Sequence, residues 1–182
     1  MTIRAIIFDM DGTLVDSLGD LSSSMNEVLS HFNFPIHSHE KYKLFIGTGI
    51  ENLVTKALPE SARTPAIIKD CLDLMKQVYS IRGLETTRLY DGIAEMLDKL
   101  VEKKIKLVCF SNKADGLTKF IGNKLFQKWN FDLILGAREG IPSKPNPAAV
   151  FEIFRYINLQ AKDFIYVGDS GIDMQTAINA GV

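Results

Sequence analysis

The hydrophobic and polar positions along the chain change their period several times. Near the N-terminus, the apolar run of residues 6–8 is rich in β-branched side chains and ends abruptly at Asp9. Such a run predicts a buried strand with polar residues at its carboxyl end. From Ser17, a residue type suited to a helix N-cap, apolar residues recur at three- and four-residue spacing as far as Phe32. This spacing predicts an amphipathic helix.

Three more helical segments follow before the pattern returns to strands. They cover residues 38–45, residues 50–58 and a longer stretch that begins at Thr64 and Pro65. Four helices in succession are too much for an ordinary connection between two strands. We therefore predict that residues 16–83 form an inserted helical subdomain. Residues 1–15 and 84–182 then form the core.

Helices and strands alternate beyond residue 84. Predicted helices span residues 91–103, 117–128, 146–157 and 173–180, and predicted strands span residues 105–110, 132–135 and 164–167. Strands that alternate with helices favour a parallel sheet with right-handed crossovers. The predicted fold class is therefore α/β, with a Rossmann-like parallel core of four strands and an inserted all-α subdomain.

Composition and charge narrow the classes of function. The 182 residues are 46% hydrophobic and 24% charged, with a formal net charge of -1. This balance is typical of a globular protein and gives no basic surface for nucleic acid or anionic lipid. The N-terminus lacks a signal-peptide pattern, and no apolar run approaches the about 20 residues of a membrane helix. We expect a cytoplasmic protein with no nucleic-acid partner and no membrane association. The two cysteines, Cys71 and Cys109, are expected to be buried free thiols.

The first predicted strand ends in a pair of carboxylates. Asp9 and Asp11 belong to the sequence Asp-Met-Asp-Gly-Thr. Two carboxylates about 4 Å apart repel by about 4 kcal/mol at an effective dielectric near 20. A hard cation such as Mg²⁺ offsets this repulsion and also coordinates phosphate. An ordinary Asp-Gly turn is the alternative, so the ends of the other strands decide between the two interpretations.

Three further segments place polar groups at the same edge of the predicted sheet. Each segment alone is typical of a turn, a helix cap or a solvated loop. Together they bring hydroxyl, amide, ammonium and carboxylate groups to the edge where open α/β sheets hold their ligands. We therefore predict a site for phosphate and a metal ion at this edge. The residues concerned are Ser111, Asn112, Lys144, Asp169 and Asp173.

These motifs resemble a known family. In type and order they match the four motifs of the haloacid dehalogenase-like (HAD) hydrolases, in the sequences Asp-Met-Asp-Gly-Thr-Leu-Val-Asp-Ser, Ser-Asn-Lys, Lys-Pro-Asn-Pro and Gly-Asp-Ser-x-x-Asp. The helical insert resembles the helical cap of that superfamily. Leu-Tyr-Asp-Gly at residues 89–92 resembles its phosphoglycolate phosphatase branch. The resemblance implies a Mg²⁺-dependent phosphomonoesterase that hydrolyses a small cytosolic phosphate ester through an aspartyl-phosphate intermediate.

The resemblance also implies roles for individual residues. Asp9 would be the nucleophile, Asp11 the general acid and base, and Lys144 the cation that stabilises the transition state. Mg²⁺ would be held by Asp9, Asp169 and the backbone carbonyl of Asp11. Asp173 would support the site by orienting Lys144 or a metal-bound water. The residues expected to bind substrate are Gly12, Thr13, Thr48, Ser111 and Asn112, although the segment around Thr48 is also typical of a simple helix joint.

Alternative functions share the same motifs. A phosphomutase of the β-phosphoglucomutase type has every motif quoted above. A non-catalytic family member that acts as a binding scaffold is a third possibility. Asp11 favours a phosphate over a haloacid substrate, because the dehalogenases of the superfamily do not need an acid at this position. The sequence predicts neither the particular ester nor the oligomeric state.

The resemblance also bears on the end of the chain. Family members usually continue beyond the position of Val182 into a further strand and a final helix. None of the four motifs lies in that part. We therefore expect residues 164–167 to form an edge strand that lacks this cover.

Overall fold

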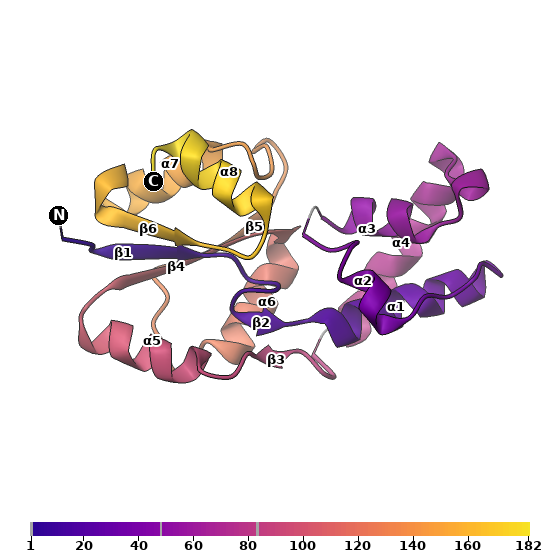
Figure 1. Cartoon of the computed structure of the whole chain (residues 1–182), viewed down its shortest axis with the longest axis horizontal. Coiled ribbons are helices and arrows are strands. Elements are labelled where there is room, and N and C mark those ends of the chain that lie inside the picture. The colour runs from indigo at the N-terminus through magenta and orange to yellow at the C-terminus, as the bar shows by residue number, and fades with distance from the viewer. Residues whose placement is uncertain (1, 48, 83) are drawn as a thin grey trace. The chain divides into compact units, whose positions relative to one another are not determined.

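The computed structural model describes residues 2–47, 49–82 and 84–182. The chain divides into two compact units, one of residues 1–15 and 89–182 and the other of residues 16–88 (Figure 1). The second division lies between Arg88 and Leu89, five residues later than the boundary expected from the sequence.

Four parallel strands form the sheet of the first unit within the described residues. They are β1 (Ala5–Phe8), β4 (Lys106–Ala114), β5 (Leu133–Ala137) and β6 (Phe164–Val167). The strand order is β5-β4-β1-β6, so β1 is an inner strand that pairs with β4 on one side and β6 on the other. The parallel α/β fold predicted from the sequence is confirmed.

Four helices pack on this sheet. They are α5 (Ile93–Glu102), α6 (Asp115–Leu125), α7 (Ala148–Ile157) and α8 (Gly171–Ala180). Helices α7 and α8 lie on one face of the sheet, and α5 lies on the other (Figure 1). On the first face, Ile7 and Val108 of the sheet share a buried cluster with Val150 and Ile153 of α7. The inner strands β1 and β4 are buried on both faces along their apolar runs, which explains why these runs are continuous.

Strand β4 continues further than the sequence predicts. It was expected to end at Phe110, but it runs to Ala114, with a shift in its pairing with β5 between those two residues. Ser111, Asn112 and Lys113 therefore lie in the irregular last part of the strand and not in a turn after it. Helix α6 begins at Asp115, two residues earlier than expected, directly after this irregular part.

The second unit is helical. It contains α1 (Leu18–His31), α2 (His39–Tyr42), α3 (Ile50–Ala57), the short 3₁₀ helix η1 (Glu60–Ala62) and α4 (Pro65–Arg82). Helix α4 packs against α1 and α3. The apolar stripe of α1 is buried as its spacing predicts. Helix α2 ends three residues before the expected Phe45, and Thr48 lies outside the described residues.

A short pairing joins the segments at the two ends of the helical unit. Strands β2 (Val15–Asp16) and β3 (Arg88–Leu89) form a two-stranded sheet. Next to it, the Asp20 carboxylate accepts hydrogen bonds from the hydroxyl groups of Thr86 and Thr87, at 2.7 and 2.6 Å, and from both of their backbone N–H groups. These bonds hold residues 86 and 87 to α1 and explain why the boundary lies later than expected. Two-residue strands are too short for a hydropathy pattern to predict.

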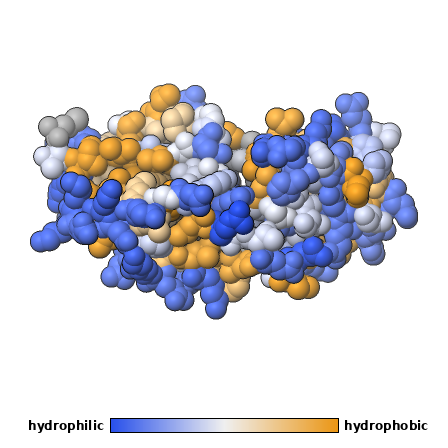
Figure 2. All heavy atoms as spheres, turned by 60° about the horizontal axis from the view of Figure 1, so that its bottom comes forward, coloured by the Kyte–Doolittle hydropathy of each residue, from blue (hydrophilic) through white to orange (hydrophobic). Residues whose placement is uncertain are grey.

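Several large hydrophobic side chains are exposed outside the cores. Ile165 lies on the edge strand β6, Tyr156 on α7 and Ile178 on α8. The face drawn in Figure 2 shows apolar areas between larger hydrophilic ones. Both cysteines are free and buried, as expected. No helix in the described part of the chain combines the length and the apolarity that crossing a membrane requires.

Candidate active site

The loop after β1 carries the first two candidate carboxylates. Asp9 directly follows β1, and its N–H donates to Val167 O at 2.9 Å, which ties it to the end of β6 as well. Beyond it the chain folds back on itself, because the N–H groups of Leu14 and Val15 donate to Met10 O, each at 3.0 Å. Gly12 lies inside this turn with a left-handed φ of 84°, which favours glycine. The turn fixes Asp9 and Asp11 at the carboxyl edge of the sheet.

Lys144 is buried between two carboxylates. Its Nζ lies 2.8 Å from Asp9 Oδ1 and 2.5 Å from Asp173 Oδ1, and it also donates to Phe110 O at 3.2 Å. The backbone of Lys144 is fixed by the Asn112 side chain, which accepts from Lys144 N at 2.8 Å and donates to Lys144 O at 3.3 Å. Asn112, which was expected to bind substrate, therefore positions the lysine in this structure.

Asp173 is fully buried and is turned towards protein groups. Besides Lys144, its carboxylate accepts hydrogen bonds from the Ser170 hydroxyl at 2.5 Å and from the Tyr166 hydroxyl at 3.4 Å. Ser170 and Asp173 also form the capping box that begins α8. Asp173 thus contacts Lys144 directly, and its supporting role stays a prediction. Tyr166 was not predicted to belong to the site, because its spacing fits an ordinary strand residue.

Asp169 lies against the turn that follows β1. Thr13 Oγ1 donates to Asp169 Oδ1 at 3.3 Å. A Cβ added at Gly12 would meet Asp169 Oδ2 at 2.4 Å, so only glycine leaves room for this carboxylate. Gly12 and Thr13 were expected to bind substrate. In the structure Thr13 donates to Asp169, and Gly12 leaves the space that the Asp169 carboxylate occupies.

Three carboxylates are close enough to share a cation. Asp9, Asp169 and Asp173 each offer an oxygen, and these oxygens lie within 4.8 Å of one another. Carboxylate oxygens are the ligands that Mg²⁺ prefers. Both carboxylate oxygens of Asp173 accept hydrogen bonds, Oδ1 from Lys144 and Oδ2 from Ser170. Asp9 and Asp169 are therefore the pair better placed to bind a cation. The donor set fits the expected magnesium ion.

Burial and neighbouring charges shift the proton affinities of this cluster. The pKa of Asp9 is raised to about 6. Burial is the largest cause, Lys144 acts in the opposite direction, and Asp173 and Asp11 add to the rise. Burial also raises the pKa of Asp169, with a further contribution from Asp173. Burial lowers the pKa of Lys144, but Asp9, Tyr166 and Asp173 more than offset this and hold it above the usual range. A bound cation would favour the charged forms of Asp9 and Asp169.

Lys113 makes a second buried ion pair at the same edge. Its Nζ lies 2.9 Å from Asp11 Oδ1. The backbone N–H of Lys113 donates to the hydroxyl of Ser111 at 3.2 Å. Lys113 was not among the predicted site residues, because only the hydroxyl of Ser111 and the amide of Asn112 were expected to act there. Its place in the Ser-Asn-Lys motif was the available signal.

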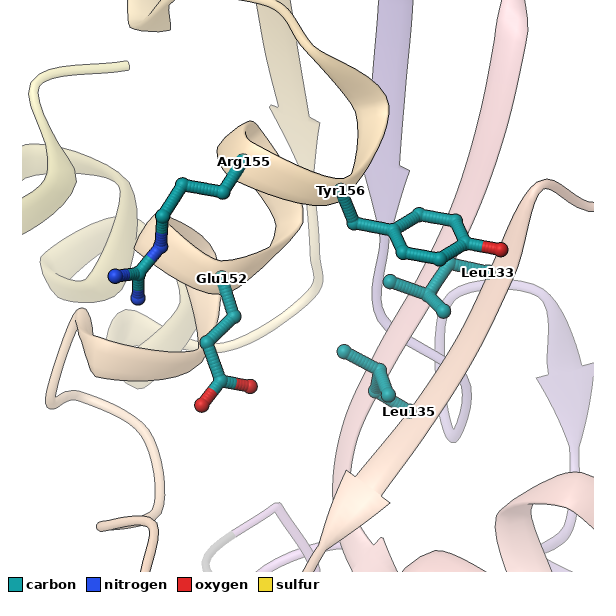
Figure 3. Close-up of a pocket in the computed structure, with 5 residues that line it drawn as sticks. All are labelled: Leu133, Leu135, Glu152, Arg155 and Tyr156. Atoms are coloured by element: carbon teal, nitrogen blue, oxygen red, sulfur yellow. The ribbon is translucent and has the colours of Figure 1, made fainter.

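A separate hollow lies at the edge strand β5. Figure 3 shows Leu133 and Leu135 of this strand facing Tyr156 of α7, with Glu152 and Arg155 on the same helix. None of the candidate site residues that the structure describes lines it. The described residues to which the sequence assigns this chemistry therefore lie at the carboxyl edge of the sheet and not in this hollow.

Comparison with known proteins supports the resemblance seen in the motifs. The family model described as haloacid dehalogenase-like hydrolase matches residues 6–182. A phosphoglycolate phosphatase of Pseudomonas syringae pv. syringae is 30% identical over 183 residues, which cover 98% of this chain and 67% of that protein. A phosphoglycolate phosphatase of Chromobacterium violaceum is 29% identical over 182 residues, covering 98% of this chain and 82% of that one.

A solved structure gives the same result. A protein of Lactobacillus delbrueckii subsp. bulgaricus, provisionally assigned as a phosphoglycolate phosphatase, superposes with a TM-score of 0.93 at 30% identity. The match covers 100% of this chain and 84% of that one. The family predicted from the motifs is thus confirmed. The chain belongs to the haloacid dehalogenase-like hydrolases, and its similarity to phosphatases of that family makes it a phosphatase-type hydrolase.

Proposed function

We propose that the protein is a Mg²⁺-dependent phosphomonoesterase that hydrolyses a small phosphate ester through an aspartyl-phosphate on Asp9. The observation that carries the proposal is the ion pair between Lys144 Nζ and Asp9 Oδ1 at 2.8 Å, next to the Asp169 carboxylate. A nucleophilic carboxylate must be held in place and kept charged close to a dianionic phosphate. A buried lysine and a metal ion together meet this requirement.

The reaction would proceed in two transfers of the phosphoryl group. First a carboxylate oxygen of Asp9 attacks phosphorus, the bond from phosphorus to the ester oxygen breaks, and Asp11 gives a proton to the leaving oxygen. Then water attacks phosphorus, Asp11 accepts a proton from that water, and the bond from phosphorus to Asp9 breaks. Orthophosphate is released and Asp9 is restored. Ser111 is the hydroxyl that we assign to a phosphoryl oxygen.

Asp9, Asp169 and the backbone carbonyl of Asp11 are the proposed magnesium ligands. When bound, Mg²⁺ would offset the repulsion among the carboxylates and the phosphate. Asp173 would act through Lys144, which it contacts directly. We keep Gly12, Thr13 and Asn112 in the site as residues that shape it, since their observed partners are Asp169 and Lys144.

Phosphoglycolate is the first substrate to test, because relatives at about 30% identity carry the name phosphoglycolate phosphatase. A cytoplasmic location fits a small metabolite of this kind. From the family resemblance we also propose that residues 16–83 act as a cap and that Thr48 binds substrate.

The test is phosphate release from phosphoglycolate, sugar phosphates, nucleotides and pyrophosphate, with Mg²⁺ or with a chelator. We expect turnover of at least one ester with Mg²⁺, and loss of turnover with the chelator and in Asp9→Asn. The matched control is Asp70→Asn, which removes an exposed carboxylate on α4 and should leave turnover unchanged. Phosphate retained on a sugar product would support the phosphomutase alternative instead. Binding without any turnover by a folded, magnesium-loaded protein would support the scaffold.

A further inference from the structure

Lys113 is a buried cation that the reaction steps above do not use. Its side chain is 7% exposed, that of its partner Asp11 is 16% exposed, and the two charged atoms are 2.9 Å apart. Burying an ion pair costs desolvation energy, so such a pair is poor evidence for a stabilising role. The question is therefore what the pair does for the carboxyl group of Asp11.

The backbone of Lys113 is held on both sides. Its N–H donates to Ser111 Oγ at 3.2 Å, and its carbonyl accepts from the Thr118 hydroxyl at 3.1 Å. Strand β5 also approaches closely, since a Cβ added at Gly136 would lie 2.5 Å from Lys113 O. This segment has little freedom to move its lysine away from Asp11.

The loop that carries Asp11 is held equally closely. Its turn is closed by the hydrogen bonds to Met10 O, and Gly12 N donates to Val15 O at 3.0 Å. Asp11 itself pairs with Val15 in an isolated bridge. The backbones of Lys113 and Asp11 are thus both fixed. The ion pair between their side chains then restricts the rotation of the Asp11 side chain.

We infer that Lys113 is a positioning residue, which holds the Asp11 carboxyl group where it exchanges a proton with the leaving oxygen and the attacking water. The inference rests on the proposed function, in which Asp11 is the acid and base. The site would thus give each reacting carboxylate its own lysine, Lys144 for Asp9 and Lys113 for Asp11. A misplaced acid loses much of its effect, since an error of about 1 Å can cost on the order of 100-fold in rate.

Esters with different leaving groups test the inference. An alkyl phosphate such as ethyl phosphate needs a proton on its leaving oxygen, whereas p-nitrophenyl phosphate does not. For Lys113→Met, which keeps the length of the side chain without its charge, we expect kcat/KM to fall about tenfold or more for ethyl phosphate. For p-nitrophenyl phosphate we expect a change of less than about threefold. The aryl ester thereby also reports whether the variant is folded.

Two further variants complete the design. Lys113→Arg keeps a cation and should recover most of the rate with ethyl phosphate. Lys124→Met, which changes an exposed lysine on α6, should behave as the unchanged protein with both esters. In the double variant Asp11→Asn with Lys113→Met, the rate with ethyl phosphate should fall no lower than in Asp11→Asn alone, because Lys113 acts through Asp11.

The outcomes separate this inference from the proposed function. Equal losses with both esters, or no loss with either, would overturn the positioning role while leaving the phosphatase intact. A further fall in the double variant would also overturn it, because Lys113 would then act independently of Asp11. If Asp11→Asn itself loses no more with the alkyl than with the aryl ester, the proposed role of Asp11 fails, and the role of Lys113 fails with it.

Discussion

Lys144 Nζ lies 2.8 Å from Asp9 Oδ1, and the lysine follows the aspartate by 135 residues in the sequence. The parallel sheet makes this contact possible, since β1, β4 and β6 all end at the edge where Lys144 enters. On its other side, Lys144 Nζ lies 2.5 Å from Asp173 Oδ1. The pair therefore depends on the whole α/β unit and links its folding to its chemistry.

Removing Lys144 should impair both activity and stability. In Lys144→Met, Asp9 and Asp173 become buried like charges with no cation between them. We expect activity to fall about 100-fold or more and unfolding free energy at pH 7.5 to fall by about 3 kcal/mol. The loss of stability should be smaller at pH 5. The pKa of Asp9 is raised to about 6, so native Asp9 binds a proton at pH 5 that the unfolded chain does not, and its destabilising effect grows as pH rises. Chemical denaturation at the two pH values checks this, with Lys124→Met as the control.

The contact between Gly12 and Asp169 can be tested against a matched glycine. Gly12 and Gly92 have nearly the same left-handed φ, 84° and 83°, but an added Cβ meets Asp169 only at Gly12 and nothing within 4 Å at Gly92. Both alanine variants should lose about 1 kcal/mol to backbone strain. Only Gly12→Ala should also lose magnesium affinity and activity. Isothermal titration with Mg²⁺ and a rate assay check this prediction. Equal magnesium affinity in the two variants would contradict the close approach of Asp169.

The raised pKa of Asp9 should make the proposed magnesium binding depend on pH. Without metal, Asp9 has a pKa of about 6, so below that pH most molecules hold a proton that Mg²⁺ must displace. We expect magnesium affinity to be nearly constant above about pH 7 and to fall by up to about tenfold per pH unit below about pH 6. Titration calorimetry at pH 5, 6 and 7.5 in buffers of different ionisation enthalpy measures both affinity and proton release. The same affinity at all three values would contradict the account.

The buried Asp20 should stabilise the helical unit. Burial raises its pKa, but the hydrogen bonds from Thr87 and Thr86 lower it more, so the pKa lies below the ordinary value of 3.8. We expect Asp20→Asn to lose about 2–3 kcal/mol of unfolding free energy at pH 7. A lowered pKa contributes stability that is present above the unfolded value and is lost as pH falls below it. The difference between the two proteins should therefore shrink below about pH 4, and Asp70→Asn should show no such loss.

Particular residues show what the sequence can and cannot predict. Asp9 and Asp169 were found because parallel strands bring their carboxyl ends to one edge, so residue type and strand position suffice. Asn112 and Thr13 were expected to bind substrate from their places in the motifs, and that role stays a prediction. Their contacts with Lys144 and Asp169 could not be predicted, because a sequence does not show which protein groups a polar side chain meets. Lys113 was overlooked for a related reason, since a hydropathy pattern does not reveal that an ion pair is buried.

The limits of the predicted elements have similar causes. The apolar run of β4 ends at Phe110, but the strand runs to Ala114, which pairs with Ala137 of β5. The irregular stretch between them is Ser111, Asn112 and Lys113, which are residue types common in turns. Pairing with a neighbouring strand is a tertiary effect that overrides local preference. Likewise, the division at Arg88 depends on Asp20, far away in the sequence.

The most direct measurement is to trap the covalent intermediate. The protein with Mg²⁺ would be mixed with the ester that it hydrolyses fastest, quenched in acid during turnover, digested and analysed by mass spectrometry. We expect one phosphoryl group on the peptide that contains Asp9, and none in Asp9→Asn or with a chelator. Turnover without any phosphorylated peptide, or phosphorylation at another residue, would contradict the role of Asp9 as the nucleophile.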